Sequence, residues 1–425
     1  EPQPYWSAFE AASEAPQLTD SGNAINLLRE VLDNAVAAQM VADVPLGAFL
    51  SGGIDSSSVV ASMQRHSSTP VRTFTIGFTE TAYDESGYAL AVANTLGTDH
   101  TELIVSPEDA MRVIPDMSKI YDEPFADASQ IPTYLVSRMA RDHVTVALSG
   151  DGGDELFGGY DRYSQLERLE RLRKWFPTLA RRVFASAVKR LPAETWDSFG
   201  NRLPDSLVPM GLQQRTGHRM HKVAQMFAAA DVPDVYASLM SIENGSGGLV
   251  LDFKHAPSVF ESLPPDQLTD LSSYERAMLI DTLTYLPGDL LTKVDRASMA
   301  VSLEVRAPFL DPDVFRFAWG LSHDHRVRAG KGKWILRELL RQSLPDTLID
   351  RPKMGFGVPI REWLRGPLRS WADELLDPKL LKEQGVLDPV TVKRRWNAHR
   401  EGRQDLTLQI WSILMFQAWL VEQPG

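Results

Sequence analysis

The chain has 425 residues, of which 43% are hydrophobic and 24% charged, a balance typical of globular proteins with one large domain or two domains. It contains no cysteine, which excludes disulfides, thiolate metal sites and a cysteine nucleophile here, and which fits a reducing cytoplasm. A net charge of −12 argues against a nucleic-acid partner, and the apolar stretch at residues 410–421 is too short to span a bilayer. We therefore expect neither a nucleic-acid nor a membrane partner, and residues 410–421 are predicted to form a buried helix.

The N-terminal part of the chain predicts an α/β fold. Residues 1–22 show no hydrophobic period and are expected to be a linker, whereas residues 23–41 have a helical pattern. After this helix, apolar runs typical of strands alternate with helical patterns as far as residue 160. The predicted strands cover residues 44–50, 71–78, 102–105 and 144–148, and the predicted helices begin at Ser57 or cover residues 84–96, 107–121 and 131–141. This alternation predicts a parallel sheet with helices on both faces.

The first strand is followed by a glycine turn, Ser-Gly-Gly-Ile-Asp-Ser at residues 51–56. The backbone N–H groups at a helix start, left uncovered at Gly52 and Gly53, form a site for an anion such as a phosphate. Asp55 would repel that anion unless it held a cation that bridges to the phosphates. The turn lacks the lysine of a Walker A sequence. We interpret it as the loop of a nucleotide-binding enzyme of another type, rather than as a plain strand-to-helix turn.

A second strand ends in a similar loop. The apolar run at residues 144–148 precedes Ser-Gly-Asp-Gly-Gly-Asp-Glu at residues 149–155, which carries the acids Asp151, Asp154 and Glu155. Ligands bind at the carboxyl ends of parallel strands, so the two loops are expected to converge on one nucleotide. A solvated acidic loop is the alternative interpretation.

Beyond residue 160 the apolar spacing is mostly helical. Residues 168–190 combine many Arg and Lys residues with apolar side chains at helical spacing. We interpret this stretch as the solvated face of amphipathic helices, with an anionic partner as the alternative.

The two loops resemble a known family. Ser-Gly-Gly-Ile-Asp-Ser is similar to the pyrophosphate-binding loop (PP-loop) of ATP pyrophosphatases, and together with residues 148–160 it resembles the synthetase domain of glutamine-hydrolysing asparagine synthetases. Further similar segments follow in the family's order at residues 121–127, 285–299, 303–311 and 351–356. The resemblance implies an ATP-dependent ligase that activates a carboxylate as an acyl-adenylate, which ammonia converts to an amide with release of AMP.

The resemblance also implies roles for particular residues. Asp151 would accept a proton from ammonia, Lys353 would stabilise charge on the departing pyrophosphate, and Asp55 and Asp154 would hold Mg²⁺. The implied ATP contacts are Leu50 and Ile76 beside the adenine, and Ser51, Gly52, Gly53, Asp55, Ser56, Ser57, Ser149 and Gly150 around the rest of the nucleotide. Weaker candidates, for which an internal ion-pair network is an equal alternative, are Lys293, Asp295, Arg296, Glu304 and Arg306.

The chain departs from the family pattern in two respects. Asp151 stands where the family usually has Glu, which shortens the reach by one methylene and leaves the acceptor carboxylate open: aspartate is expected, and a uronic acid is the alternative. The N-terminal glutaminase domain of the family is not in this sequence. We therefore expect residues 1–22 to be the remnant of a linker from that domain, and ammonia to come from it or from solution.

Residues 23–425 are expected to form the synthetase-like domain, with an α/β core over residues 23–160 and a mainly helical part over 161–425. A nucleotide-binding domain without enzymatic activity is a further alternative, and a homodimer is left open as its assembly.

Overall fold

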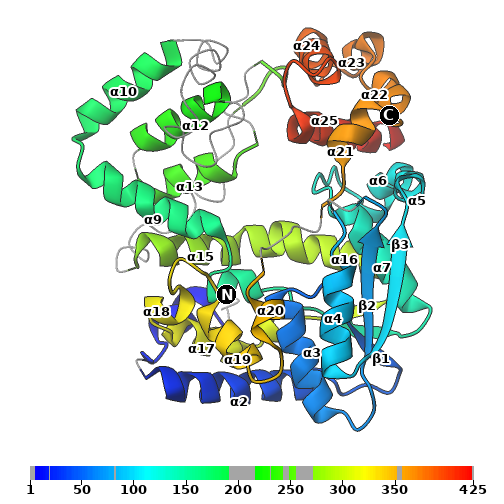
Figure 1. The fold of residues 1–425 in the computed structure, drawn as a ribbon. Helices are drawn as coiled ribbons and strands as arrows, with labels where there is room; N and C mark the ends of the chain where they lie inside the picture. The colour runs from blue at the N-terminus through cyan, green and yellow to red at the C-terminus, as the bar shows by residue number, and fades with distance from the viewer. Residues whose placement is uncertain are drawn as a thin grey trace. The chain divides into compact units, whose positions relative to one another are not determined.

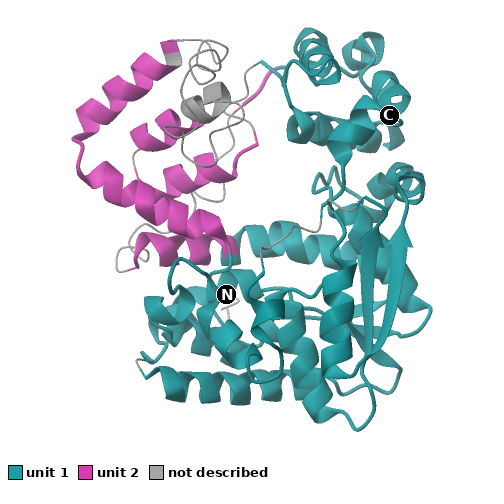
Figure 2. Ribbon diagram, viewed as in Figure 1, with its two compact units in different colours: residues 1–159, 248–251, 282–425 teal, residues 160–247, 252–281 magenta. Residues whose placement is uncertain are grey.

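The computed structural model describes residues 5–18, 20–80, 83–190, 216–229, 231–242, 248–254, 271–351 and 357–423. The chain divides into two compact units (Figure 2). Unit 1 comprises Glu1–Gly159, Gly248–Leu251 and Thr282–Gly425, and unit 2 comprises Tyr160–Gly247 and Asp252–Asp281. Unit 2 starts at residue 160. Residues 282–425, which are mainly helical, belong to the same unit as the α/β core.

Unit 1 is built on a five-stranded sheet in which all strands are parallel (Figure 1). The strand order is β3-β2-β1-β4-β5. The strands are β1 (Leu46–Phe49), β2 (Arg72–Phe78), β3 (Asp99–Val105), β4 (Val146–Leu148) and β5 (Glu304–Arg306). The first four lie where strands were predicted, which confirms the α/β fold class. β5 was not predicted, because a three-residue strand with one apolar side chain carries little pattern.

The helices of the N-terminal half of unit 1 follow the predicted alternation. They are α1 (Ala8–Ser13), α2 (Ser21–Gln39), α3 (Ile54–His66), α4 (Ser86–Leu96), α5 (Pro107–Val113), α6 (Met117–Tyr121), α7 (Gln130–Arg141) and α8 (Gly153–Phe157). The helix predicted over residues 107–121 is divided by a 3-10 turn, Ile114–Asp116, because Pro115 cannot donate the backbone hydrogen bond that a continuous α-helix needs. α1 lies within the segment expected to be aperiodic, and beside it the Trp6 ring packs edge-on against Phe315 at 5.1 Å between centroids.

Helices cover both faces of the sheet, as predicted. Successive side chains of a strand point to opposite faces. Ile76 and Phe78 of β2 belong to a buried apolar core that also contains Leu135 of α7. Gly77, between them, faces the start of α4, where an added Cβ would lie 2.8 Å from the Cβ of Ser86. β2 is therefore buried between α7 and α4.

After unit 2 the chain returns to unit 1 through a π-helical turn, Leu286–Leu291, which leads into α16 (Thr292–Met299). The remaining helices are α17 (Pro312–Gly320), α18 (His323–Arg326), α19 (Trp334–Leu340), α20 (Asp346–Ile349), α21 (Ile360–Arg365), α22 (Arg369–Leu375), α23 (Pro378–Gln384), α24 (Pro389–Arg400) and α25 (Thr407–Glu422). α25 contains residues 410–421 and buries Ile410, Trp411 and Leu414, which confirms the predicted buried helix. Among the helices that the structure describes, none has the length and apolar character to cross a membrane.

Unit 2 is helical in its described part. It contains α9 (Asp161–Lys174), α10 (Thr178–Arg190), α12 (Thr216–Ala228), α13 (Val232–Met240) and most of α15 (Ser273–Leu283). A buried polar centre joins α9, α13 and α15. There Asp281 accepts hydrogen bonds from Tyr163 Oη at 2.7 Å and from Arg162 Nη2 at 2.6 Å, while Arg162 Nε donates to Tyr236 Oη at 2.8 Å. The buried carboxylate is thus paired and hydrogen-bonded, as burial of a charge requires.

Candidate nucleotide and metal site

The glycine turn at residues 51–56 connects β1 to α3 at the carboxyl end of the sheet. Gly52 has a φ of +69°, and a side chain there would meet backbone atoms at 2.9 Å, including Ala89 N. Only glycine combines that conformation with that close approach. Gly53 is the N-cap of α3 and offers no capping side chain, so backbone N–H groups at the helix start remain available to an anion.

Serine side chains hold the shape of this turn. Ser56 Oγ accepts a hydrogen bond from Ser51 N at 3.2 Å and lies 3.1 Å from Ser51 Oγ, which in turn accepts one from Gly53 N at 3.3 Å. Ser57 is buried at the start of α3. The turn is therefore rigid before any ligand is bound, which is the condition for a preorganised anion site.

The second loop lies in direct contact with the first. Ser149 follows β4, is buried, and its backbone N donates to Arg306 O at 2.8 Å. A Cβ added at Gly150 would lie 2.7 Å from Ser56 N. The two loops that the sequence singles out thus meet where β1 and β4, which are neighbours in the sheet, end side by side.

Lys333 joins the two predicted metal carboxylates. Its Nζ donates a hydrogen bond to Asp55 Oδ2 and lies 2.6 Å from Asp154 Oδ1. Only 5% of Lys333 is exposed. Burial alone would lower the pKa of Lys333, but the carboxylates of Asp154 and Asp55 outweigh it and raise that pKa above the usual lysine value, so the ammonium is charged.

Glycines next to these charges allow the contact. A side chain at Gly159 would collide with the Asp154 carboxylate and with Lys333, and one at Gly332 would collide with Gly158 O. Lys333 itself has a φ of +56°, an uncommon conformation for a lysine. Such strain at a buried, charged position is typical of functional sites. We did not predict Lys333 from the sequence. The pattern that could have indicated it is Gly-Lys-Gly-Lys at residues 330–333.

Arg351, the first residue of the similar segment at 351–356, is anchored at the glycine turn. Its guanidinium donates hydrogen bonds to Glu85 Oε1 at 3.2 Å and to Ser51 O at 3.4 Å. The Cζ atom of Arg351 lies 4.4 Å from the centroid of the Tyr88 ring. Lys353 itself lies outside the described residues.

Asp151 lies in the second loop near a partly buried ion pair. Lys293 Nζ on α16 is 2.6 Å from Asp127 Oδ2, and Asp127 also accepts hydrogen bonds from Ser129 N at 2.9 Å and Ser129 Oγ at 2.8 Å. Burial raises the pKa of the Asp151 carboxyl, while the Ser149 hydroxyl and the charge of Lys293 oppose that rise. Burial also acts to raise the pKa of Asp127, but Lys293 and Ser129 prevail and lower it, so the pair is ionised.

Other candidates lie on or directly after the strands next to the loops. Leu50 directly follows β1 and is buried, and its backbone N donates to Phe74 O of β2. Ile76 lies two residues further along β2 and is also buried. Arg306 donates to Glu304 at 2.7 Å and to the backbone oxygens of Gln39 and Val41. That geometry fits the internal network that we gave as the alternative for Glu304 and Arg306.

The acidic groups fit a cation that also binds phosphate. Asp55 and Asp154 converge on one ammonium, so the same oxygens can converge on a metal ion. In the ranges that the structure describes, no three His, Cys, Asp or Glu side chains are grouped closely enough to hold a metal alone. Mg²⁺ is usually held by one or two carboxylates, with substrate phosphates and water completing its six ligands.

Known proteins share this sequence pattern. Residues 27–421 match the family model described as asparagine synthase. A protein of Mycobacterium tuberculosis, provisionally assigned as a glutamine-hydrolysing asparagine synthetase, is 36% identical over 394 residues, which cover 92% of this chain and 56% of that protein. Glutamine-hydrolysing asparagine synthetase 1 of Bacillus subtilis is 30% identical over 415 residues, covering 96% of this chain and 61% of its own length. The amidase chyE of Penicillium rubens is 25% identical over 442 residues, covering 95% of this chain and 61% of the amidase.

The chain thus spans little more than half the length of the first two relatives. The family match, however, includes both loops, Lys333 and all five strands. The chain belongs to the asparagine synthase family.

Proposed function

We propose that this chain is an ATP-dependent amide-forming ligase. An acceptor carboxylate oxygen attacks the α-phosphorus of ATP, the bond between the α-phosphorus and the bridging oxygen breaks, and pyrophosphate leaves. Ammonia then attacks the acyl carbon of the resulting acyl-adenylate, AMP leaves, and an amide remains after loss of a proton from nitrogen.

The observation that carries this proposal is the meeting of the two loops around Asp55, Asp154 and Lys333. Phosphoryl transfer of this kind needs positioning and charge neutralisation more than covalent help from the protein. The turn at Gly52 and Gly53 supplies backbone N–H donors for the β- and γ-phosphates. Mg²⁺, when bound, would neutralise phosphate charge. Asp55 and Asp154 would hold it, and Lys333 and the expected Lys353 would supply further positive charge.

The ammonia step assigns a role to Asp151. As a carboxylate it would accept the proton that nitrogen loses, and it lies in the loop that follows β4, close to the nucleotide turn. Burial raises the pKa of Asp151, and the Ser149 hydroxyl and the cation of Lys293 oppose that rise, which favours the ionised form that can accept a proton.

For the acceptor we propose aspartate, with asparagine as the product. Support comes from the names of the relatives, which are asparagine synthetases. A uronic acid remains the alternative, because Asp151 is shorter than the family's usual Glu. Those relatives are named as glutamine-hydrolysing, so we propose that ammonia reaches this chain from a glutaminase domain and that free ammonia can replace it.

The test measures pyrophosphate release from ATP and Mg²⁺ with ammonium chloride, comparing aspartate with uronic acids. We expect release that depends on aspartate and that falls at least about 100-fold in Asp55→Asn, since electrostatic groups at a transition state contribute at this order. Asp313→Asn is the matched control, because Asp313 is an exposed acid on α17.

Release with a uronic acid alone would keep the chemistry and replace the acceptor. Retained ATP binding without pyrophosphate release, in a preparation also supplied with free ammonia, would contradict the ligase proposal. Equal losses in Asp55→Asn and Asp313→Asn would contradict the assignment of the site.

A further inference from the structure

Unit 2 carries a strip of exposed apolar side chains at the junction of α9 and α10. We call it the α9–α10 strip and define it by Leu172, Trp175, Leu179 and Val183, which are 52%, 83%, 75% and 61% exposed. Leu179 and Val183 lie one helical turn apart on α10 and therefore share a face. Soluble proteins expose single apolar residues routinely, whereas several large exposed apolar residues close together in the chain are typical of an interaction surface.

The strip is separate from the face by which α10 packs in unit 2. Ala185 and Val188 of α10 are buried with Ala224 of α12, and the Phe184 ring packs edge-on against Phe227 at 5.7 Å between centroids. α10 thus has an inward apolar face that is packed and an outward apolar face that is exposed. The inward face accounts for the folding of the helix, and the outward face has no such role.

The sequence around the strip is rich in basic residues. The segment from residue 168 to residue 190 has a single acid, Glu170, and this acid pairs with Arg173. Its basic residues are Arg168, Arg171, Arg173, Lys174, Arg181, Arg182, Lys189 and Arg190. Of these, Arg173 is buried and Arg171 pairs with Glu167, whereas Arg168, Lys174, Arg182 and Arg190 are exposed. In a chain whose net charge is −12, this segment is therefore a local excess of positive charge.

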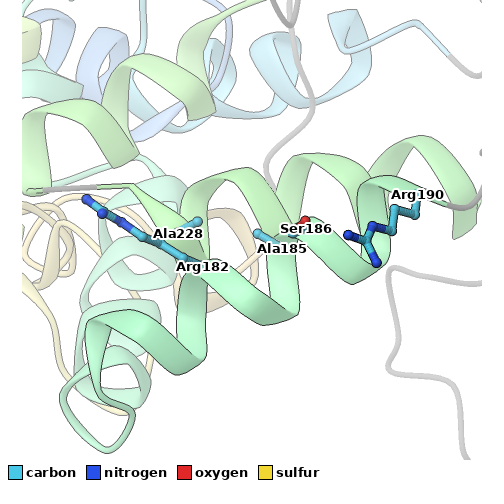
Figure 3. Close-up of a pocket in the computed structure, with 5 residues that line it drawn as sticks. All are labelled: Arg182, Ala185, Ser186, Arg190 and Ala228. Carbon is cyan, nitrogen blue, oxygen red and sulfur yellow. The ribbon is translucent and has the colours of Figure 1, made fainter.

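A shallow cavity of about 420 Å³ lies beside the strip, between α10 and the end of α12 (Figure 3). It is lined by Arg182, Ala185, Ser186, Arg190 and Ala228. Figure 3 shows Arg182 and Arg190 on either side of the two small residues Ala185 and Ser186. Two guanidinium groups at an open cavity provide the planar donors that bind phosphate groups.

We propose that unit 2 binds the surface of an anionic lipid bilayer through the α9–α10 strip, with Arg182 and Arg190 contacting headgroup phosphates. Helices that lie in a membrane interface combine exposed Trp and Leu with flanking Arg and Lys in this way. The charges favour a bilayer over a second copy of the chain. In a two-fold dimer the same basic surface would face itself, and like charges would repel. This attachment is peripheral, is independent of the ligase proposal, and departs from our expectation that the protein has no membrane partner.

The experiment is co-sedimentation of the full chain with vesicles of phosphatidylcholine alone or of phosphatidylcholine mixed with phosphatidylglycerol. We expect binding to the anionic vesicles only, weakened by added salt because the charges are exposed. The double variant Leu179→Asp/Val183→Asp should bind at least about tenfold more weakly, since each change places a charge in the interface. The matched control is Val390→Asp/Leu408→Asp, two similarly exposed apolar residues of unit 1.

A second measurement keeps the inward face and the helix intact. Brominated lipid should quench part of the tryptophan fluorescence of the wild type, and Trp175→Phe should lose that part while still binding vesicles. Circular dichroism checks that each variant keeps its helices.

Equal vesicle binding by wild type and by Leu179→Asp/Val183→Asp would overturn the proposal. So would vesicle binding that inorganic phosphate abolishes at equal ionic strength, because that result indicates a site for free anions. Failure to bind anionic vesicles, together with dimerisation that the strip variant abolishes, would identify the strip as a contact between copies instead.

Discussion

Lys333 occupies the position between Asp55 and Asp154 where a divalent cation would neutralise both carboxylates. The three side chains belong to the glycine turn, to α8 and to the residue before α19. Without a cation between them, the two partly buried acids would repel each other. Lys333 therefore keeps the site folded in the absence of nucleotide, and it is close enough to meet the phosphates when the nucleotide binds.

This arrangement makes Lys333 a competitor of the metal ion. We expect Lys333→Met to bind Mg²⁺ more tightly than the wild type in the absence of ATP, by roughly tenfold, because one neighbouring opposite charge shifts a carboxylate by about 1–3 pKa units. Pyrophosphate release should nevertheless fall, since a cation at the phosphates is lost. Titration calorimetry with Mg²⁺ checks the first effect. Lys331→Met, which removes a largely exposed lysine paired with Asp350, is the control. Unchanged Mg²⁺ affinity in Lys333→Met would refute the competition.

Asp151 should control the pH dependence of the ammonia step. Burial raises the pKa of Asp151, so its carboxyl takes up a proton at a higher pH than an ordinary Asp, which titrates near about 4. The protonated form cannot accept a proton from nitrogen. We therefore expect the rate, plotted against free ammonia, to fall as pH is lowered through this raised pKa.

In Asp151→Asn the rate should no longer fall in this way at low pH. The reaction should also be slower by about 10²–10⁴, the usual contribution of a general base. In Lys293→Met the rate should fall at a higher pH than in the wild type, because the positive charge that favours the ionised carboxyl of Asp151 is gone. If the rate of both variants fell at the same pH as that of the wild type, the titration would belong to another group.

At the scale of elements, the site depends on how closely two strand-to-helix loops approach. A methyl group at Gly150 would lie 2.7 Å from Ser56 N, a backbone atom that cannot move without distorting α3. We expect Gly150→Ala to lower the free energy of unfolding by about 1–3 kcal/mol, as overpacking does. It should also abolish ATP binding.

Gly87→Ala is the matched change in the neighbouring helix α4. An added Cβ at Gly87 meets nothing within 4 Å, and alanine favours a helix over glycine by about 0.5–1 kcal/mol. It should therefore stabilise the protein slightly and leave ATP binding intact. Urea unfolding and nucleotide titration measure both variants. Comparable ATP affinity in Gly150→Ala and Gly87→Ala would show that the two loops need not touch.

Elements with a strong local pattern could be predicted from the sequence, and contacts between distant segments could not. β1, β2 and β4 were found because each is an apolar run bounded by turn residues. The two loops were found because glycines and acids directly follow such runs. β5 was missed because Glu304 and Arg306 are charged, although β4 places them in the sheet.

The pairing of Lys333 with Asp55 and Asp154 was beyond prediction for a related reason. A single lysine forms no periodic pattern or motif in the sequence, and its partners lie far earlier in the chain. The ion pair of Lys293 with Asp127 likewise joins α16 to the residues before α7, which are distant in sequence. The carboxylates of the site and Lys293 were singled out from motifs, whereas Lys333 and the ion-pair partners of both lysines were visible only in the fold.

At the scale of the whole molecule, the described site residues belong to unit 1, and unit 2 has its own polar centre. Arg162→Met would leave Asp281, which is fully buried, without its cation. We expect this variant to destabilise unit 2 by about 3–5 kcal/mol, the usual result of breaking a buried ion pair. ATP binding, measured below the melting temperature, should stay within about twofold of the wild type, a difference under 1 kcal/mol.

Calorimetric unfolding and nucleotide titration check the two halves of this expectation. Arg171→Met is the control on the same helix, because its pair with Glu167 is largely exposed and should contribute less than about 1 kcal/mol. Equal destabilisation by the two variants would indicate that the centre around Asp281 does not hold unit 2 together.

The parallel register of the sheet has a consequence for synthesis of the chain. Val146 of β4 lies opposite Glu304 of β5, and all of unit 2 is encoded between them. While a ribosome produces unit 2, the edge of β4 that later pairs with β5 has no partner strand. Unpaired strand edges promote aggregation. Lys333 emerges later still, so the acids at Asp55 and Asp154 meet their cation only after β5 is in place. A nascent chain is therefore most vulnerable while unit 2 is being made, and binding of a chaperone to that edge would protect it.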